Sequence, residues 1–151
     1  MTGEKLIADN RRARHDYHLG DRVEAGVVLT GTEVKALREG KTSLQRAYAD
    51  VENGEAWLVG VHIPEYLQGN RANHDPERPR KLLLHRREID GLYGQVKEKG
   101  VTLVPTRMYF KDGRVKVEIA VARGKELHDK RRDIAARDAQ RQIERELGRR
   151  R

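Results

Sequence analysis

The chain of 151 residues contains no cysteine, one serine, one tryptophan, one phenylalanine and four prolines. Without cysteine it cannot build a disulfide scaffold or a thiolate zinc site. The only serine, Ser43, precedes an expected strand and is not part of a nucleophile elbow, and the sequence has no Walker-type phosphate loop. These absences exclude the commonest motifs for nucleophilic hydrolysis and for nucleotide binding.

Long hydrophobic runs are missing as well. No apolar segment approaches the roughly 20 residues that a membrane-spanning helix needs. The opening residues, MTGEKLIADN, lack the apolar centre of a signal peptide. We therefore expect a soluble, cytoplasmic protein with no membrane partner.

Positive charge is abundant and unevenly placed. The net charge is +8. Residues 123–151 carry eleven Lys or Arg against six Asp or Glu, which gives +5, whereas residues 1–122 carry 21 against 18, which gives +3. Concentrated Lys and Arg predict a polyanionic partner, most often a nucleic acid and less often an anionic membrane surface.

Alternating apolar and polar residues predict antiparallel strands. In one strand Val23 and Ala25 point to one face and Glu24 to the other, and in another Trp57 shares a face with Val61. Two hairpins are marked by dipeptides that permit positive φ at both turn positions. The hairpins are 43–51 with 55–63 around Asn53-Gly54, and 101–110 with 114–122 around Asp112-Gly113.

Two helices are expected between the strands. One spans residues 30–40, where Thr30 and Glu33 have capping-box spacing, and the other spans residues 86–100 and ends at Gly100. The predicted fold class is mainly β with helices. Because several short strands must protect their edges, an OB-like closed antiparallel barrel with flanking helices is favoured, with a two-sheet sandwich as the alternative.

We expect two parts, a barrel domain over residues 1–122 and a basic tail over residues 123–151. Residues 1–19 and 64–81 are polar or basic and are expected to lie outside the strands. Within the tail an arginine recurs at every fourth position, which forms a basic stripe on a helix. Isolated helices of this length are marginal in water, so the tail is predicted to be disordered when free and helical when bound to RNA. The arginines of the stripe are Arg137, Arg141, Arg145 and Arg149.

Three His-Asp doublets raise the alternative of a metal-dependent nuclease or phosphohydrolase. They are His15-Asp16, His74-Asp75 and His128-Asp129. Such a site requires the doublets to converge around a metal with an open position. All three lie in segments predicted to be irregular, so we interpret them as polar residues that contact phosphate or backbone. We expect no catalytic residue, no metal and no cofactor.

Several motifs occur together and in order along the chain. They are IADNRRARHDY, EAGVVLTGTEVKALREG, GNRANHDPERPRKLLLHRREI, GRVKVEIAVARGK and HDKR. From about Ile7 to Arg141 the chain resembles the small protein B family, the tmRNA-binding (SsrA-binding) proteins of bacteria.

The resemblance implies an OB-like fold, no enzymatic activity and binding to the tRNA-like domain of tmRNA charged with alanine. It implies delivery of this RNA to ribosomes stalled without a stop codon, which is ribosome rescue by trans-translation. The tail would lie in the vacant mRNA channel against rRNA of the small subunit. Elongation factor Tu would be an indirect partner through alanyl-tmRNA, and we expect a monomer.

Residue roles follow from the matching motifs. The resemblance implies that Glu24, Leu83 and Lys116 contact tmRNA, and Asn10, Arg12 and Arg14 are expected to join them. Val23 stands where an aromatic residue is common in the family. A generic basic OB-type RNA-binding or ribosome-associated protein remains the alternative. Residues expected at the ribosomal decoding region are His15, His128, Asp129, Lys130, Arg131, Arg137, Arg141 and Arg145.

Overall fold

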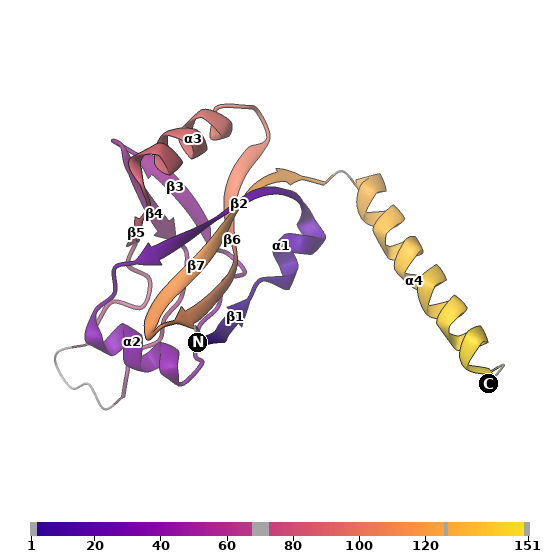
Figure 1. Ribbon diagram of the computed structural model, residues 1–151, viewed down its shortest axis with the longest axis horizontal. Coiled ribbons are helices and arrows are strands. Elements are labelled where there is room, and N and C mark those ends of the chain that lie inside the picture. Colours follow the sequence, from indigo (N-terminus) through magenta and orange to yellow (C-terminus); the bar gives the residue numbers. More distant parts are fainter. Residues whose placement is uncertain (1–2, 68–72, 126, 150–151) are drawn as a thin grey trace.

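The computed structural model describes residues 3–67, 73–125 and 127–149, and for residues 127–133 and 149 it describes the backbone alone. These residues form seven strands and four helices (Figure 1). The strands are β1 (Glu4–Asp9), β2 (Tyr17–Val27), β3 (Tyr48–Glu52), β4 (Glu55–Val59), β5 (Arg80–Leu83), β6 (Val101–Lys111) and β7 (Arg114–Gly124). The helices are α1 (Arg11–Asp16), α2 (Gly31–Arg38), α3 (Arg86–Val96) and α4 (Leu127–Arg149). The predicted class, mainly β with helices, is confirmed.

All seven strands belong to one antiparallel sheet. Its order is β1-β6-β3-β4-β5-β2-β7, and β6 also pairs with β7. The six strands from β6 to β7 in this order therefore form a closed ring. The strand β1 is attached to the outside of β6. This single sheet is not the alternative arrangement of two separate sheets.

Both predicted hairpin turns are confirmed. Asn53 and Asp112 have a φ of 52°, and the glycines that follow them, Gly54 and Gly113, have φ values of 74° and 77°. A positive φ at both turn positions gives a backbone twist that matches the twist of the flanking strands. The turns therefore set the register of β3 with β4 and of β6 with β7.

The expectation that Trp57 shares a buried face with Val61 is wrong. In β4 the buried residues are Ala56 and Leu58, whereas Trp57 lies half-buried on the opposite face. The alternation is interrupted at Gly60, which has a φ of 82°. A Cβ atom at Gly60 would lie 2.6 Å from the backbone oxygen of Arg46, so only glycine fits this crossing of two chain segments.

The expectation that residues 1–19 lie outside the strands is also wrong. β1 pairs with β6 from Glu4 opposite Lys111 to Asp9 opposite Arg107, and Tyr17 already belongs to β2. The signal was weak because β1 has six residues, and its three apolar residues are consecutive instead of alternating with polar ones. The predicted loop of residues 64–81 likewise ends early, since β5 begins at Arg80.

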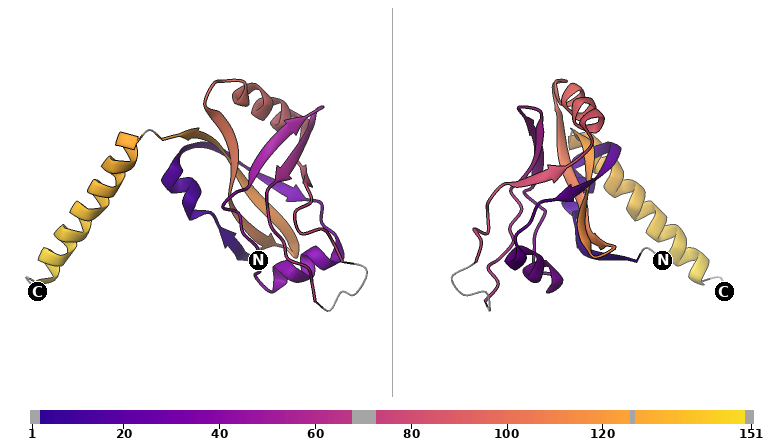
Figure 2. Two further views of the ribbon diagram at one scale, coloured as in Figure 1. Left: turned by 180° about the vertical axis from the view of Figure 1, so that it is seen from behind. Right: turned by 60° about the vertical axis from the view of Figure 1, so that its left-hand side comes forward.

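The two helices predicted between strands are present. Thr30 and Glu33 form the expected capping box at the start of α2. The helix α3 ends at Val96 rather than at Gly100, which instead provides a positive φ of 83° before β6. α2 and α3 lie at opposite ends of the strand body, and α4 projects away from it (Figures 1 and 2).

A buried ion network joins α2 to the segment before β5. Glu33 is 0% exposed and Arg80 is 1% exposed. Arg80 Nε donates to Glu33 Oε2 at 2.7 Å, and Arg78 Nε donates to Glu33 Oε1 at 3.1 Å. Burial acts to raise the pKa of Glu33, but the hydrogen bonds from Arg78, Thr30 and Arg80 outweigh it and hold that pKa below its usual value. This network anchors the chain that leads into β5.

Candidate nucleic-acid interface

Leu83, Gly26 and Lys116 form one row across three neighbouring strands. Gly26 on β2 pairs with Leu83 on β5 at one side and with Lys116 on β7 at the other. The row continues to Tyr109 on β6, the cross-strand partner of Lys116. Directly paired residues point to the same face of a sheet, and so do residues two apart on one strand. Glu24 therefore lies on this face as well, so the sheet unites the three residues matched to tmRNA-contacting positions.

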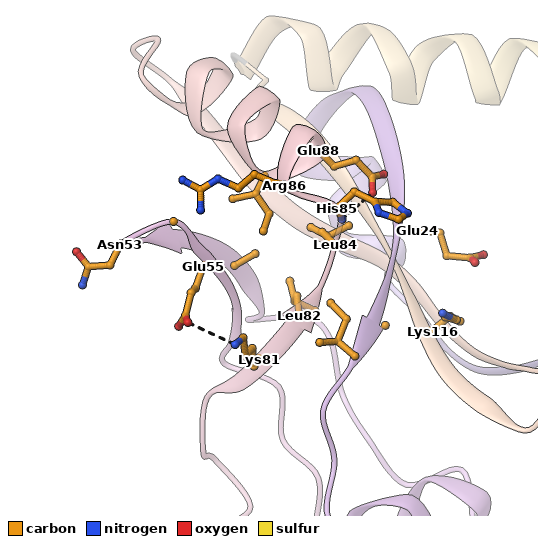
Figure 3. A pocket seen from close by; sticks show the side chains of 15 residues that line it. Glu24, Asn53, Glu55, Lys81, Leu82, Leu84, His85, Arg86, Glu88 and Lys116 are labelled. Carbon is orange, nitrogen blue, oxygen red and sulfur yellow. Dashed lines mark hydrogen bonds and ion pairs between the residues drawn. The ribbon is translucent and has the colours of Figure 1, made fainter.

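An open pocket of about 770 Å³ lies over this face. Leu83 is 56% exposed within it, and Lys81 pairs with Glu55 at 3.4 Å. In Figure 3, Glu24 and Lys116 stand at one side of the pocket and Glu55 stands at the other. Its lining residues include Asn53, Gly54, Lys81, His85, Arg86 and Glu88 besides Glu24, Gly26, Leu83 and Lys116. The pocket is thus open, lined by both polar and apolar side chains, and bordered by several cations.

Gly26 forms the floor of a notch in this pocket. A Cβ atom on Gly26 would lie 3.3 Å from Leu83 Cβ and 3.7 Å from Lys116 Nζ. The absence of a side chain therefore lets the exposed Leu83 side chain and the Lys116 ammonium group approach each other closely over β2.

Glu24 is the one carboxylate among the residues matched to tmRNA contacts. The hydroxyl of Tyr109 donates a hydrogen bond to Glu24 Oε2, and Lys111 Nζ lies 3.3 Å from the same oxygen. The Tyr109 hydrogen bond is the main reason that the pKa of Glu24 is lowered; burial opposes it, and Lys111 and Lys116 lower the pKa further. Glu24 therefore stays ionised and can only accept hydrogen bonds.

Lys116 differs from the neighbouring cations because it has no ion-pair partner among the residues that the structure describes. Lys111 is engaged by Glu24, and Lys81 by Glu55. An unpaired ammonium group on an open face can bind a phosphate without first breaking an internal ion pair. This makes Lys116 the strongest candidate for a phosphate contact in the pocket.

Asn10 is placed differently from what the sequence suggested. Its side chain is 2% exposed, donates to the backbone oxygens of Leu44 at 3.1 Å and Pro105 at 2.8 Å, and accepts from Ala13 N. The expectation that this side chain contacts RNA is therefore wrong in this structure, because its hydrogen bonds are made inside the protein. Its position as N-cap instead fixes the start of α1.

The other residues of α1 are exposed. Arg12 pairs with Asp16 at 3.3 Å, Arg14 pairs with Asp9, and His15 Nδ1 is 2.8 Å from Asp16 Oδ1. None of the three lines the pocket that holds Lys116. The expected grouping of Arg12 and Arg14 with Glu24 and Lys116 is therefore absent from the described residues.

α1 instead faces the base of α4. A second pocket, of about 510 Å³, is lined by Arg11, Arg14, His15, Lys125, Ala136 and Arg137. It brings His15 near Arg137, two residues that the sequence assigned to the same ribosomal role. Sequence reasoning missed Arg11 and Lys125, although both belong to the basic stretches on either side. Lys125 is held there by its backbone N–H, which donates to Asp16 O at 2.9 Å.

The remaining tail residues are found on α4 or lie outside the described side chains. Arg141 and Arg145 are exposed and border a shallow pocket with Asp138, Gln142 and Glu146. The apolar strip of the tail is exposed as well, with Ile143 at 52% and Leu147 at 58%. The side chains of His128, Asp129, Lys130 and Arg131 are not described.

The His-Asp doublets do not form a metal site in the described part of the chain. No group of three or more His, Asp or Glu side chains there could hold a metal ion. His74 is buried, with Nδ1 2.8 Å from Thr32 Oγ1 and Nε2 2.8 Å from the backbone oxygen of Ile63. His15 is instead hydrogen-bonded to its own neighbour, Asp16. Among the described helices, none is long and apolar enough to span a membrane.

Val23, the position at which the sequence departs from the family pattern, packs against the core rather than onto the open face. The molecule is thus a small basic β protein that displays a lysine, a carboxylate and an exposed leucine on one face and carries a charged helix. These features define a binding protein for a polyanionic partner.

The chain belongs to the SmpB family. Residues 7–149 match the family model for the SmpB protein, which confirms the resemblance found in the sequence motifs. The SsrA-binding protein of Acidothermus cellulolyticus is 60% identical over 149 residues, which cover 99% of this chain and 94% of the relative. That of Thermobifida fusca is 62% identical over 149 residues, with 99% and 93% covered.

A solved structure shares the fold. One chain of "tmRNA-SmpB: a journey to the center of the bacterial ribosome" aligns with a TM-score of 0.68 and 49% sequence identity. The alignment covers 80% of this chain and 85% of that chain. Fold and family therefore agree.

Proposed function

We propose that this chain binds the tRNA-like domain of tmRNA and delivers it to ribosomes stalled without a stop codon, so that trans-translation can tag the nascent peptide. The observation that carries the proposal is the row of Leu83, Gly26 and Lys116 with Glu24 on the same face. Family membership, relatives named SsrA-binding proteins and the likeness to a tmRNA-SmpB structure support it.

The chemistry of the face suits folded RNA. Structured RNA is recognised through shape, phosphates and 2′-hydroxyl groups more than through a base code. Lys116 supplies a cation for a phosphate, and the Glu24 carboxylate accepts a hydrogen bond from a hydroxyl or amino group. Leu83 packs against the apolar side of a sugar or a base. A carboxylate beside a free lysine distinguishes this face from a simple phosphate-binding surface.

The two-part organisation proposed for the chain is an OB-like barrel domain over residues 1–122 and a basic tail over residues 123–151. The return of the strand ladder through β6 and β7 supports the closed form. β7 runs to Gly124, two residues past the proposed boundary. We propose that Arg137, Arg141 and Arg145 contact small-subunit rRNA in the vacant mRNA channel.

We further propose that α4 is the form of the tail in its bound state and that the free tail is largely disordered. Residues 134–148 are exposed throughout, so burial contributes little to the stability of α4. Coupling of folding to RNA binding would suit a segment that must enter only an empty channel.

Further partners and properties follow from the same proposal. The protein acts as an adaptor and not as an enzyme, it works as a monomer in the cytoplasm, and it meets elongation factor Tu only through alanyl-tmRNA. These statements derive from the family resemblance. The ionised Glu24 and the unpaired Lys116 are compatible with a role in RNA binding.

A competition experiment separates this function from the alternative of a generic basic RNA-binding protein. Binding of the full chain to the tRNA-like domain is measured against an unrelated structured RNA of equal length. We expect at least tenfold tighter binding to the tRNA-like domain, a difference of about 1.4 kcal/mol. Equal affinity for both RNAs would favour the generic alternative.

A further inference from the structure

Tyr109 is an aromatic residue that reaches across a strand. It lies on β6 opposite Lys116 of β7, yet its hydroxyl donates to Glu24 on β2, the strand beyond β7. Tyr109 is 2% exposed, and the guanidinium of Arg107 lies 4.4 Å from the centre of its ring. The Arg107 guanidinium thus packs against the face of the ring, and the hydroxyl points to Glu24 at the edge of the pocket that also holds Lys116.

The surroundings show why Glu24 needs a fixed partner. Glu24 on β2 is directly opposite Glu118 on β7, and two like charges in this position repel each other. Glu118 is neutralised by Arg107 Nε at 2.8 Å and by Arg22 at 3.5 Å. Glu24 is bound differently, because its shortest hydrogen bond comes from a neutral hydroxyl. The neutral hydroxyl holds the carboxylate in place, and Lys111 pairs with the same carboxylate at 3.3 Å.

We propose that Tyr109 is a positioning residue of the tmRNA-binding face, which fixes the Glu24 carboxylate as an acceptor for hydroxyl or amino donors of the RNA. The inference rests on the function proposed above. A glutamate side chain on an open face has several rotatable bonds, and their freedom is lost on binding. Because the Tyr109 hydroxyl restrains Glu24 in advance, less of this freedom remains to be lost when the RNA arrives.

The protonation state of Tyr109 supports this role. Burial raises its pKa, and the hydrogen bond to Glu24 and the charge of Glu24 raise it further. The hydroxyl therefore keeps its proton at all physiological pH values and remains a donor. The hydroxyl has no other hydrogen-bond partner among the residues that the structure describes.

A double-mutant cycle tests the proposal. Affinities for the tRNA-like domain are measured for wild type, Tyr109→Phe, Glu24→Gln and the double variant. Tyr109→Phe keeps the ring over Arg107 and should weaken binding about three- to tenfold, the range for loss of one hydrogen bond. In the Glu24→Gln background the same change should have little further effect, because its action passes through Glu24. Tyr93→Phe, which removes a hydroxyl from an exposed tyrosine of α3, serves as the matched control.

A pH profile provides a readout that a purely structural role would not alter. Besides Tyr109, the charged groups around Glu24 are Lys111, Lys116 and Glu118, with Arg107 beyond and His85 in the same pocket. Loss of the Tyr109 hydrogen bond should raise the pKa of Glu24. The loss of affinity on acidification should therefore begin at a higher pH in Tyr109→Phe. Parallel data for Glu24→Gln separate the titration of Glu24 from every other pH-dependent effect on the protein or the RNA.

The results also separate this proposal from the proposed function. If Glu24→Gln weakens binding and Tyr109→Phe does not, the positioning role is wrong and the function stands. If Tyr109→Phe lowers the affinity equally in the wild-type and Glu24→Gln backgrounds, the Tyr109 hydroxyl acts without Glu24, and the proposal is overturned. If neither variant alters tight and specific binding, Glu24 is not an RNA contact, and the positioning role is overturned without loss of the function.

Discussion

Leu83 and Lys116 lie on either side of a single glycine, Gly26, although 33 residues separate them in the sequence. The first is an exposed apolar group and the second is a cation without an ion-pair partner in the described chain. The two side chains can lie this close because β2 has no side chain at this point. This notch, with Glu24 at its edge, is the centre of the proposed tmRNA interface.

Filling the notch should weaken RNA binding without unfolding the protein. In Gly26→Ala the new methyl group would lie 3.3 Å from Leu83 Cβ, a tight contact at the root of that side chain, so Leu83 and its strand would have to move slightly. We expect affinity for the tRNA-like domain to fall about tenfold, or about 1.4 kcal/mol. Gly20→Ala on the same strand is the matched control, because its methyl group would only make ordinary contact with the backbone oxygen of Val121 at 3.5 Å. Binding measurements with both variants check the prediction, and equal affinities would rule out a ligand in the notch.

The buried Glu33 network should make the free energy of unfolding depend on pH in the acidic range. The pKa of Glu33 is lower in the folded protein than in the unfolded chain. The contribution of Glu33 to the free energy of unfolding is therefore present above its pKa in the unfolded chain, and it is lost as the pH falls through its pKa in the folded protein. Glu33→Gln should destabilise the protein by about 3–5 kcal/mol, because it leaves buried Arg80 without its carboxylate. The difference in unfolding free energy between wild type and variant should shrink as the pH falls below about 4.5. Denaturant unfolding at several pH values measures this.

Glu39→Gln is the control for that experiment, since Glu39 is exposed and, among the residues that the structure describes, forms an ion pair only with Lys41 at 3.3 Å. Its effect on stability should be below about 1 kcal/mol. A loss for Glu33→Gln as small as that for Glu39→Gln would show that the network does not anchor the chain before β5.

The tail should affect ribosome rescue but not RNA capture. Replacing Arg137, Arg141 and Arg145 by alanine in the full chain removes three of the four arginines of the basic stripe and keeps residues that favour a helix. Affinity for the tRNA-like domain should change less than about threefold, because these residues lie outside the notch, whereas tagging on stalled ribosomes should be lost. A binding assay and a tagging assay with the same variant separate the two. Loss of both would mean that the tail holds the RNA.

The free tail should show little helix by circular dichroism. A peptide of residues 123–151 has few apolar residues, and in the structure its apolar side chains Ile143 and Leu147 are exposed. Isolated helices of this composition gain little from burial. A strongly helical spectrum of the peptide without RNA would contradict the proposed disorder of the free tail.

Local signals in the sequence predicted local structure well. The turns at Asn53-Gly54 and Asp112-Gly113 and the capping box of Thr30 and Glu33 depend on neighbours within a few residues, and all are present. By contrast, the break in alternation at Gly60 depends on its contact with the backbone of a distant segment. No local pattern contains that information.

The site was predicted less completely. Family motifs indicated Glu24, Leu83 and Lys116, but only the register of β5, β2 and β7 shows that they share a face around Gly26. Asn10 reads as a polar residue in a basic stretch, and its burial depends on backbone groups far away in the chain. Tyr109 was missed because an aromatic residue in a strand usually indicates core, and its hydroxyl partner lies two strands away.

The most direct test of the account is the affinity of Lys116→Ala for the tRNA-like domain beside Lys41→Ala, a matched change on an exposed lysine after α2. We predict about tenfold weaker binding for Lys116→Ala, a salt dependence reduced by about 0.7 to 0.9 in log–log slope, and an unchanged affinity for Lys41→Ala. If Lys116→Ala binds as tightly as wild type and keeps the full salt slope, the face formed by Glu24, Leu83 and Lys116 is not the tmRNA interface.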